Sequence, residues 1–313
     1  MSSTRREFLA ASAVAATGLL TPAGVAAPCE SRPACVRLPD GRRLAYSEYG
    51  NPKGSVVVFY HHGLPSSRRE AEVFVPSLAD FPDVRLVAFD RPGIGTSDPV
   101  ARPSYRGWAD DLAAAADALG ASRFALAGTS GGTPYALSAA LAYPDRVTRV
   151  ALCCPVAEHE RGRDNGGSAW FLKLARMTPR VAEGALKAAA RLVARKPERV
   201  TRLLPLTPDE RRMFDDPANV ELVVGFILDS VQYGADGVVA EAAMLPGPWG
   251  LPLCKLAVPV TLLHGTEDRI APCWMSAKLA RQIPGAAARY YHGEGHLSLP
   301  RKFAADAIAA AVG

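Results

Sequence analysis

The stretch that most constrains the fold is GTSGG at residues 128–132, which directly follows the apolar run Phe124–Ala127. A short apolar run predicts a buried strand, and the residues after the glycines predict a helix. A strand and a helix joined so closely leave room only for a sharp turn, with Ser130 at its apex in a strained backbone conformation. Gly128 and Gly132 leave space for the crowded backbone, so the spacing G-x-S-x-G predicts a presented serine hydroxyl. The alternative is a glycine-rich turn that only joins strand to helix.

Apolar runs and helical patterns alternate along most of the chain. The sequence Asp40-Gly41 between two apolar runs predicts a hairpin. Continuous apolar strands joined through helices predict an α/β fold, with a mostly parallel sheet covered on both faces and the hairpin at its edge. Strands are expected at 35–39, 43–49, 56–60, 86–89, 124–127, 147–154, 260–263 and 289–291, and helices at 70–80, 104–119, 134–143, 276–282 and 301–312.

Length and composition indicate one core with an insertion. The chain has 313 residues, of which 49% are hydrophobic, and a formal charge of +5. That charge is small and no basic block with interleaved aromatics accompanies it, so no nucleic-acid partner is expected. Residues 157–250 interrupt the alternation with helical, arginine-rich sequence, and we interpret them as a cap over the carboxyl ends of the strands. The core then comprises residues 29–156 and 251–313.

Charged side chains recur at helical spacing in the first half of this insertion. A solvated helix face explains the pattern best, and contact with an anionic lipid surface or an acidic substrate is the alternative. The residues concerned are Lys173, Arg176, Arg180, Glu183, Lys187, Arg191, Arg195, Glu198 and Arg202.

The first 28 residues differ in kind from the rest. Arg5 and Arg6 precede Phe8-Leu9 and an alanine-rich, weakly apolar run to about Ala27. This pattern resembles a twin-arginine export signal, which implies a working place outside the cytoplasm. An uncleaved membrane anchor or a chance arginine pair is the alternative.

The chain has six cysteines, and if it is exported some of them can form disulfides, because disulfides persist outside the cytoplasm. Cys29 with Cys35, and Cys254 with Cys273, are possible pairs. Cys153-Cys154 lies in an apolar strand, so we expect two buried thiols that point to opposite faces. Since there is no C-x-x-C pair and no mixed Cys/His cluster, no metal site is predicted.

A serine hydroxyl becomes a good nucleophile only when a base takes its proton and a carboxylate orients that base. Of the six histidines, His296 follows two glycines in a loop after the last strand, whereas His292 is still at the strand end. We therefore predict His296 as the base, with a buried structural histidine as the alternative. The acid should follow the preceding strand, where Asp268 is favoured over Glu267 because the shorter side chain is the commoner orienting group.

Glu158, after another core strand, is a third candidate for the acid. A tetrahedral intermediate also needs two backbone N–H donors for its oxyanion. The residue after the nucleophile, Gly131, supplies one, and Leu64 in the loop after strand 56–60 supplies the other. His61 and His62 in the same loop are interpreted as supports rather than bases.

The chain contains five motifs in a fixed order: HGLP at 62–65, DRPGIGTSD at 90–98, GTSGG at 128–132, HGTED at 264–268 and GH at 295–296. In this order and spacing they resemble the α/β-hydrolase superfamily, and the likeness spans residue 35 to the end apart from the cap. The resemblance implies a serine hydrolase that forms an acyl-enzyme on Ser130, because a carboxylate nucleophile for alkyl transfer is missing from the elbow. A carboxylic ester is the expected substrate; an aminopeptidase or amidase, a C–C bond hydrolase, or a non-catalytic binding protein are the alternatives. No metal or organic cofactor is expected.

Overall fold

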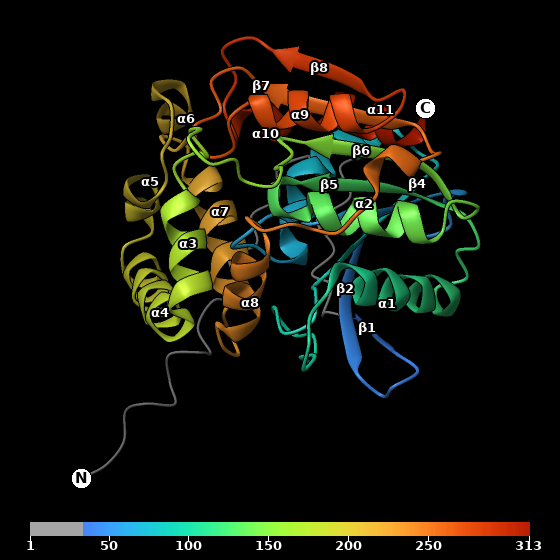
Figure 1. The fold of residues 1–313 in the computed structure, drawn as a ribbon, viewed down its shortest axis with the longest axis horizontal. Coiled ribbons are helices and arrows are strands. Elements are labelled where there is room, and N and C mark those ends of the chain that lie inside the picture. The colour runs from blue at the N-terminus through green and yellow to red at the C-terminus, as the bar shows by residue number, and fades with distance from the viewer. Residues whose placement is uncertain (1–33) are drawn as a thin grey trace, which may run out of the picture. The chain divides into compact units, whose positions relative to one another are not determined.

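The structure is a computed structural model that describes residues 34–313, and its centre is an eight-stranded sheet (Figure 1). The strand order is β1-β2-β4-β3-β5-β6-β7-β8, in which β1 pairs antiparallel with β2 and β2 antiparallel with β4, while every other pair is parallel. The predicted mostly parallel sheet with an antiparallel hairpin at its edge is confirmed. The strands are β1 Ala34–Arg37, β2 Arg43–Gly50, β3 Val56–His61, β4 Val84–Phe89, β5 Phe124–Thr129, β6 Val147–Cys153, β7 Val260–Gly265 and β8 Ala287–Tyr291.

Helices cover both faces of the sheet. Alternate residues of the central strands accordingly belong to two different apolar clusters, one on each face. Phe59 and Leu126 belong to the cluster that also contains residues of α1 (Tyr105–Ala118), α2 (Thr133–Ala142) and α9 (Trp274–Gln282). Val58 and Ala125 pack on the other face, against η1 (Arg68–Asp80) and α11 (Ala304–Val312). Side chains that are buried on both faces explain why these strands read as continuous apolar runs.

Two of the expected helices differ from the observed ones, the first in helix type and the second because it is divided in two. The segment predicted at 70–80 is a 3₁₀ helix, η1, that contains Pro76. Because proline has no backbone N–H to donate, it interrupts a regular α-helical ladder there. The helix predicted at 301–312 is two helices, α10 (Ser298–Lys302) and α11, since the backbone of Phe303 between them leaves the helical region at φ −117°.

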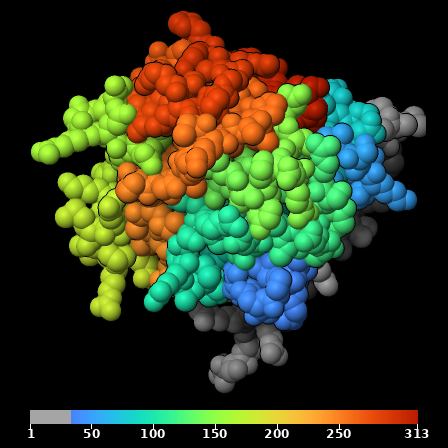
Figure 2. Space-filling model, turned by 45° about the vertical axis from the view of Figure 1, so that its right-hand side comes forward, coloured from blue at the N-terminus to red at the C-terminus, as the bar shows by residue number. Residues whose placement is uncertain are grey.

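Helices α3 to α8 lie between β6 and β7 in the sequence and gather on one side of the sheet in Figure 1. Figure 2 shows the yellow-green surface of the first of these helices well apart from the blue edge hairpin. Lys173, Arg176, Arg180 and Arg191 are exposed there. No helix within residues 34–313 is both long and apolar enough to cross a membrane. The bounds are α3 Ala169–Met177, α4 Pro179–Arg195, α5 Val200–Leu203, α6 Pro208–Met213, α7 Pro217–Ser230 and α8 Asp236–Met244.

The cysteines exclude one possible pair and correct one expectation. Cys254 and Cys273 are free thiols in the structure, the first in a short turn before β7 and the second just before α9, so the pair that the sequence left possible is not formed. Cys153 and Cys154 are buried as predicted, but β6 ends at Cys153 and Cys154 turns away with φ +46°. Both therefore contact the same apolar cluster instead of opposite faces. Cys29, and the predicted export signal at residues 1–28, lie outside the described residues.

Candidate active site

Ser130 occupies a strained turn between β5 and α2. Its φ is +51°, a left-handed value that non-glycine residues rarely adopt. The turn packs tightly against the end of β3, because a Cβ atom at Gly132 would lie only 2.2 Å from the carbonyl oxygen of His61. The glycine is needed for this close approach, and the close approach holds the serine at the carboxyl edge of the sheet.

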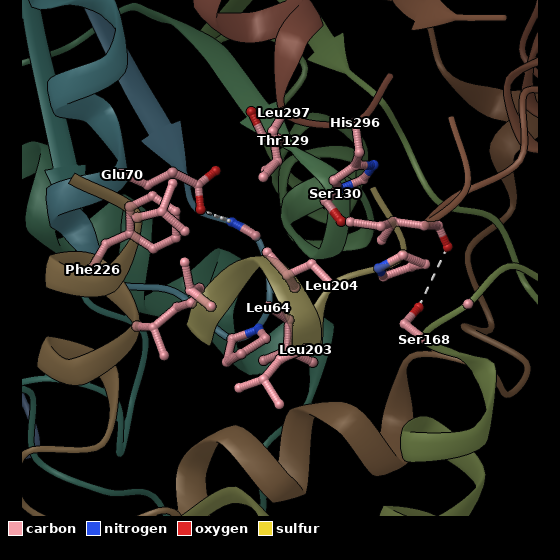
Figure 3. Close-up of a pocket in the computed structure, with 18 of the residues that line it drawn as sticks. Leu64, Glu70, Thr129, Ser130, Ser168, Leu203, Leu204, Phe226, His296 and Leu297 are labelled. Carbon is pink, nitrogen blue, oxygen red and sulfur yellow. Dashed lines mark hydrogen bonds between the residues drawn. The ribbon is translucent and has the colours of Figure 1, made fainter. Parts of the chain in front are cut away.

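An imidazole and a carboxylate meet beside this turn, and they come from two different loops. The Nδ1–H of His296 donates to Oδ2 of Asp268 at 2.7 Å, and both side chains are buried. The other carboxylate oxygen, Oδ1, accepts from the backbone N–H groups of Ile270 and Ala271 at 2.9 and 2.8 Å. The bond at Nδ1 leaves Nε2 of the imidazole as the free acceptor. In Figure 3 the ring lies next to Ser130, and both residues line one cavity.

The two groups shift each other's pKa in opposite directions. Burial alone would lower the pKa of His296, but the charge and hydrogen bond of Asp268 outweigh it and hold the pKa above its ordinary value of 6.5. Glu210 and Glu70 add smaller contributions in the same direction. Burial alone would raise the pKa of Asp268, yet its bonds to His296 and His264 hold it well below its usual range. The carboxylate is therefore ionised at neutral pH.

The alternative acids and base lie elsewhere. Glu267 and His292 are exposed, and the backbone N–H of Glu267 donates to the carbonyl of Glu294. Glu158 accepts a 2.6 Å hydrogen bond from the backbone N–H of Trp249, outside the wall of the Ser130 cavity. Of the three candidate acids, Asp268 is the one whose carboxylate is hydrogen-bonded to His296.

Leu64 and Gly131 are neighbours although 67 positions separate them. A Cβ atom at Gly131 would lie 3.4 Å from the backbone nitrogen of Leu64 and 3.0 Å from the Leu64 Cβ. Two backbone N–H groups therefore occur close together at the turn that presents Ser130. A side chain at position 131 would crowd the loop after β3, so the glycine keeps these groups near each other.

Buried polar side chains hold that loop, and the sequence did not single them out. Glu70 accepts from the N–H of Gly63 at 2.9 Å and from the hydroxyl of Tyr60 at 2.7 Å. Arg91 donates to the carbonyl oxygens of His62 and Gly63 at 2.6 and 3.1 Å, and its charge is paired with Glu241 of α8. The only signal for Arg91 is its place in the motif at 90–98, and none marks Glu70 or Glu241.

His61 is the last residue of β3, one position beyond the predicted end of that strand, and His62 is the first residue of the loop that follows. Nδ1 of His61 bonds the carbonyl oxygen of Ala127 at 3.1 Å, and Nδ1 of His62 bonds that of Gly63 at 2.8 Å. Burial lowers the pKa of His61 to about 3 and that of His62 well below its ordinary value. Both rings are thus neutral and contact backbone instead of the Ser130 hydroxyl.

The cavity in front of Ser130 has a volume of about 290 Å³ and a largely apolar wall. The segment between β6 and β7 supplies much of that wall, with Phe171, Leu186, Leu204 and Phe226 among the contributors. Figure 3 shows Leu203, Leu204 and Phe226 across the cavity from the serine. The space therefore suits an apolar part of a ligand bound beside Ser130.

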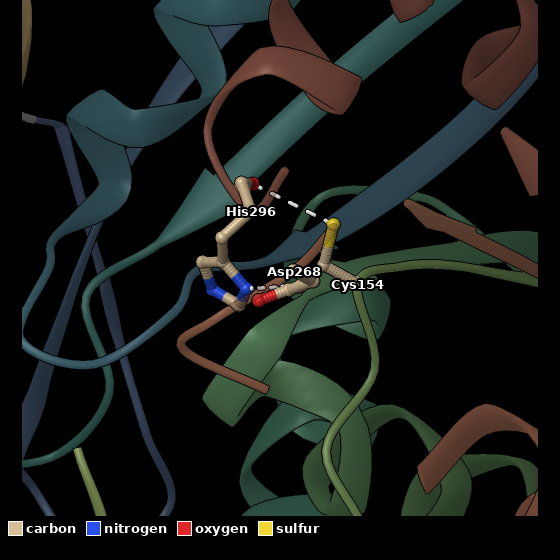
Figure 4. Close-up of side chains that lie close together, drawn as sticks. All are labelled: Cys154, Asp268 and His296. Carbon is tan, nitrogen blue, oxygen red and sulfur yellow. Dashed lines mark hydrogen bonds and ion pairs between the residues drawn. The ribbon is translucent and has the colours of Figure 1, made fainter. Parts of the chain in front are cut away.

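Within the described part of the chain, one group of residues has side-chain atoms that could act as metal ligands close together. Cys154, Asp268 and His296 have such atoms within 4.8 Å of one another (Figure 4). Their hydrogen bonds already explain the arrangement, since Nδ1 of His296 is bonded to Asp268 and the thiol of Cys154 donates to the His296 carbonyl oxygen at 3.5 Å. Burial raises the pKa of Cys154 well above its ordinary value, so the sulfur is a protonated thiol and a poor ligand.

A family model described as "alpha/beta hydrolase fold" matches residues 56–302, which is most of the chain. The protein belongs to the α/β-hydrolase fold family. The match includes β3, the Ser130 turn and the Asp268 and His296 loops, so the resemblance predicted from the five motifs is confirmed at the level of fold and family, and the protein is a hydrolase-fold enzyme.

The individual proteins that this chain resembles have different named activities. A proline iminopeptidase of Xylella fastidiosa is 33% identical over 116 residues, which is 36% of this chain and 36% of the relative. The chain thus aligns with about a third of that relative's length. A magnesium-chelatase 30 kDa subunit of Rhodobacter capsulatus is 28% identical over 79% of this chain and 82% of its own. A solved thermophilic esterase from Thermogutta terrifontis superimposes with a TM-score of 0.64 at 24% identity, over 89% of this chain and 97% of its own.

Proposed function

We propose that the protein is a serine hydrolase that cleaves carboxylic esters through an acyl-enzyme on Ser130. The observation that carries this proposal is the meeting of three features at one cavity: the strained serine, the paired Asp268 and His296, and the neighbouring N–H groups of Leu64 and Gly131. A serine, a base and an orienting acid at the entrance of an apolar cavity are the parts that acyl transfer requires.

In the proposed reaction, Ser130 Oγ attacks the ester carbonyl carbon while Nε2 of His296 takes the hydroxyl proton. The N–H groups of Leu64 and Gly131 stabilise the oxyanion of the tetrahedral intermediate. The imidazolium, oriented by Asp268, then gives its proton to the leaving alkoxide as the C–O bond breaks. Water repeats the sequence on the acyl-enzyme, which releases the acid and restores the serine.

The insertion at residues 157–250 serves in this proposal as a cap that selects the substrate. Its helices contribute apolar side chains to the cavity wall, so an ester with an apolar acyl or alcohol part fits better than a strongly charged one. The iminopeptidase relative supports a second candidate, amide cleavage on the same three residues. This candidate would be favoured if the protein turned over amino-acid p-nitroanilides at least as fast as p-nitrophenyl esters.

The test is turnover of p-nitrophenyl esters from acetate to palmitate by the parent, by Ser130→Ala and by a matched control, Ser168→Ala. Ser168 lines the same cavity, but its hydroxyl faces the carbonyl of Ile270 at 3.4 Å, so the control should keep its activity. Loss of the serine nucleophile should lower kcat by about 10⁶. Hydrolysis that persists in a folded Ser130→Ala protein would exclude the mechanism.

We also propose that the chain is exported. The support is the sequence at Arg5-Arg6 and the weakly apolar run that follows, both of which lie outside the described residues. Replacement of both arginines by lysine should retain the protein in the cytoplasmic fraction, as measured by immunoblots of fractionated cells. Unchanged export of that variant would contradict the proposal.

A further inference from the structure

Glu210 is a fully buried carboxylate in the insertion, with 1% of its surface exposed. It lies at the third position of α6, where its Oε2 accepts from the N–H of Thr207 at 2.9 Å and its own N–H donates to the Thr207 hydroxyl at 3.1 Å. This reciprocal pair is a capping box, a common way to begin a helix. It occupies only one of the two carboxylate oxygens.

The second oxygen, Oε1, faces the loop that carries His296. It accepts from the N–H of Leu297 at 2.7 Å and lies 3.4 Å from the N–H of Ser298. These are the two residues that directly follow the imidazole. On the other side of His296, a Cβ atom at Gly295 would lie 2.3 Å from the Glu210 Cδ, so only glycine allows this approach.

Helix capping alone does not account for this burial. A capping-box carboxylate can remain in water, whereas taking an ionised group out of water is costly unless other hydrogen bonds compensate. For Glu210 the compensation comes from Leu297 and Ser298, 87 and 88 positions later in the chain. The contact is therefore specific to the loop of His296.

We propose that Glu210 is a positioning residue, through which the insertion fixes the backbone around His296 and so orients the imidazole toward Ser130. The inference rests on the proposed function. The insertion would then help to position His296 relative to Ser130, in addition to lining the cavity. Displacing a catalytic group by about 1 Å can cost on the order of 10² in rate, which sets the scale of the expected effect.

Glu210 also adds negative charge near the imidazole. The charges that act on His296 come from Asp268, Glu210 of α6 and Glu70 of η1, and the thiol of Cys154 contacts its carbonyl oxygen. Arg301 of α10 lines the same cavity and bonds Asn219. Burial lowers the pKa of His296, Asp268 raises it most, and Glu210 raises it further. Removal of the Glu210 charge should therefore lower the His296 pKa, an effect that a purely structural role would not produce.

The experiment compares four variants of the full chain. Glu210→Ala removes the carboxylate, and Glu210→Gln removes the charge but keeps an amide oxygen that can accept from Leu297. Thr207→Ala breaks the capping box without touching the His296 loop. Asp209→Asn is the matched control, since Asp209 is the neighbouring carboxylate on α6 and pairs at the surface with Arg212. The readouts are kcat and KM on a p-nitrophenyl ester, and the His296 titration by NMR, assigned with a His296→Asn variant.

The expected result is a fall in kcat of about 10²-fold in Glu210→Ala with a much smaller change in KM, while Thr207→Ala and Asp209→Asn stay near the parent. In Glu210→Gln most of kcat should return, and His296 should titrate at lower pH. An equal loss in Thr207→Ala, an unchanged kcat in Glu210→Ala, or an unchanged titration in Glu210→Gln would each overturn the proposal. If Glu210→Ala does not fold, the Glu210→Gln titration decides.

Failure of the proposed function gives a different pattern. If the parent hydrolyses no ester, the kinetic comparison is lost for every variant, yet the His296 titration still differs between the parent and Glu210→Gln. A shift without ester turnover would therefore reject the esterase proposal and keep the Glu210 contact, and ester turnover without a shift would do the reverse.

Discussion

Replacing Asp268 by asparagine is the substitution for which the structure gives the clearest expected mechanism. Oδ1 of Asp268 accepts from the N–H groups of Ile270 and Ala271, and Oδ2 accepts from Nδ1–H of His296. An asparagine at this position must place its oxygen toward the two backbone donors, because its NH₂ group cannot accept a hydrogen bond. The NH₂ group then faces His296 and donates to Nδ1.

That reversal changes the tautomer of the imidazole. With Nδ1 as an acceptor, the proton moves to Nε2, which can no longer take the proton of Ser130. The known cost of such a change in a serine triad is about 10⁴ in kcat, and at about 1.36 kcal/mol for each tenfold change this corresponds to roughly 5.4 kcal/mol of barrier. The fold should survive, since the replacement has the same size and keeps both backbone hydrogen bonds.

The assay is steady-state hydrolysis of p-nitrophenyl butyrate by Asp268→Asn, Glu267→Gln and Glu158→Gln, with thermal unfolding of each variant as the check on folding. Glu267 is exposed, and the carboxylate of Glu158 accepts from the backbone N–H of Trp249 away from the Ser130 cavity, so both glutamine variants should retain kcat within about twofold. If Asp268→Asn kept kcat within tenfold of the parent, or if either glutamine variant lost more than about 10³-fold, the assignment of the orienting acid would be wrong.

Three further outcomes follow from the same contacts. Because His296 must be neutral to act as a base and its pKa is held above 6.5, kcat/KM should begin to fall on acidification at a pH above 6.5; a plateau extending to pH 5 would contradict this. Glu241→Ala leaves the buried Arg91 without its charge partner and should lower the free energy of unfolding by about 3–5 kcal/mol in urea titrations, whereas a change below 1 kcal/mol would show that the pair is dispensable. Leu204→Trp should fill part of the cavity and shorten the acyl chain that gives the highest kcat/KM, and an unchanged chain-length profile would place the acyl group elsewhere.

Local patterns predicted the sheet because the residues that decide it are contiguous. The apolar run at Phe124–Ala127, the Asp40-Gly41 turn and the glycines around Ser130 each act within a few residues, and each element appears at its expected place. The segment at 70–80 is helical as predicted, but it is a 3₁₀ helix, because the N–H donor that Pro76 lacks affects the hydrogen-bond pattern and not the hydrophobic spacing. The roles of Asp268 and His296 stay predictions, although their hydrogen bond has the geometry that the predicted order requires.

The residues that the sequence missed act over long separations. Glu210 bonds the loop of His296 across 87 positions, and Arg91 bonds Glu241 across 150. No periodicity or spacing links such pairs, since their contact exists only after the insertion has packed on the core. The possible bridge between Cys254 and Cys273 is not formed, because closeness in sequence does not determine where two side chains lie once β7 separates them.

Two of these long-range acids give the insertion a role that its apolar lining alone would not suggest. Glu241 of α8 neutralises Arg91, which holds the carbonyl groups of the loop leading to Leu64. Glu210 of α6 holds the loop of His296. The inserted helices thus support the proposed oxyanion donors on one side of Ser130 and the proposed base on the other. An insertion that lacked these two carboxylates could still enclose an apolar cavity, but it would leave a buried arginine unpaired and two N–H groups of the His296 loop without an acceptor.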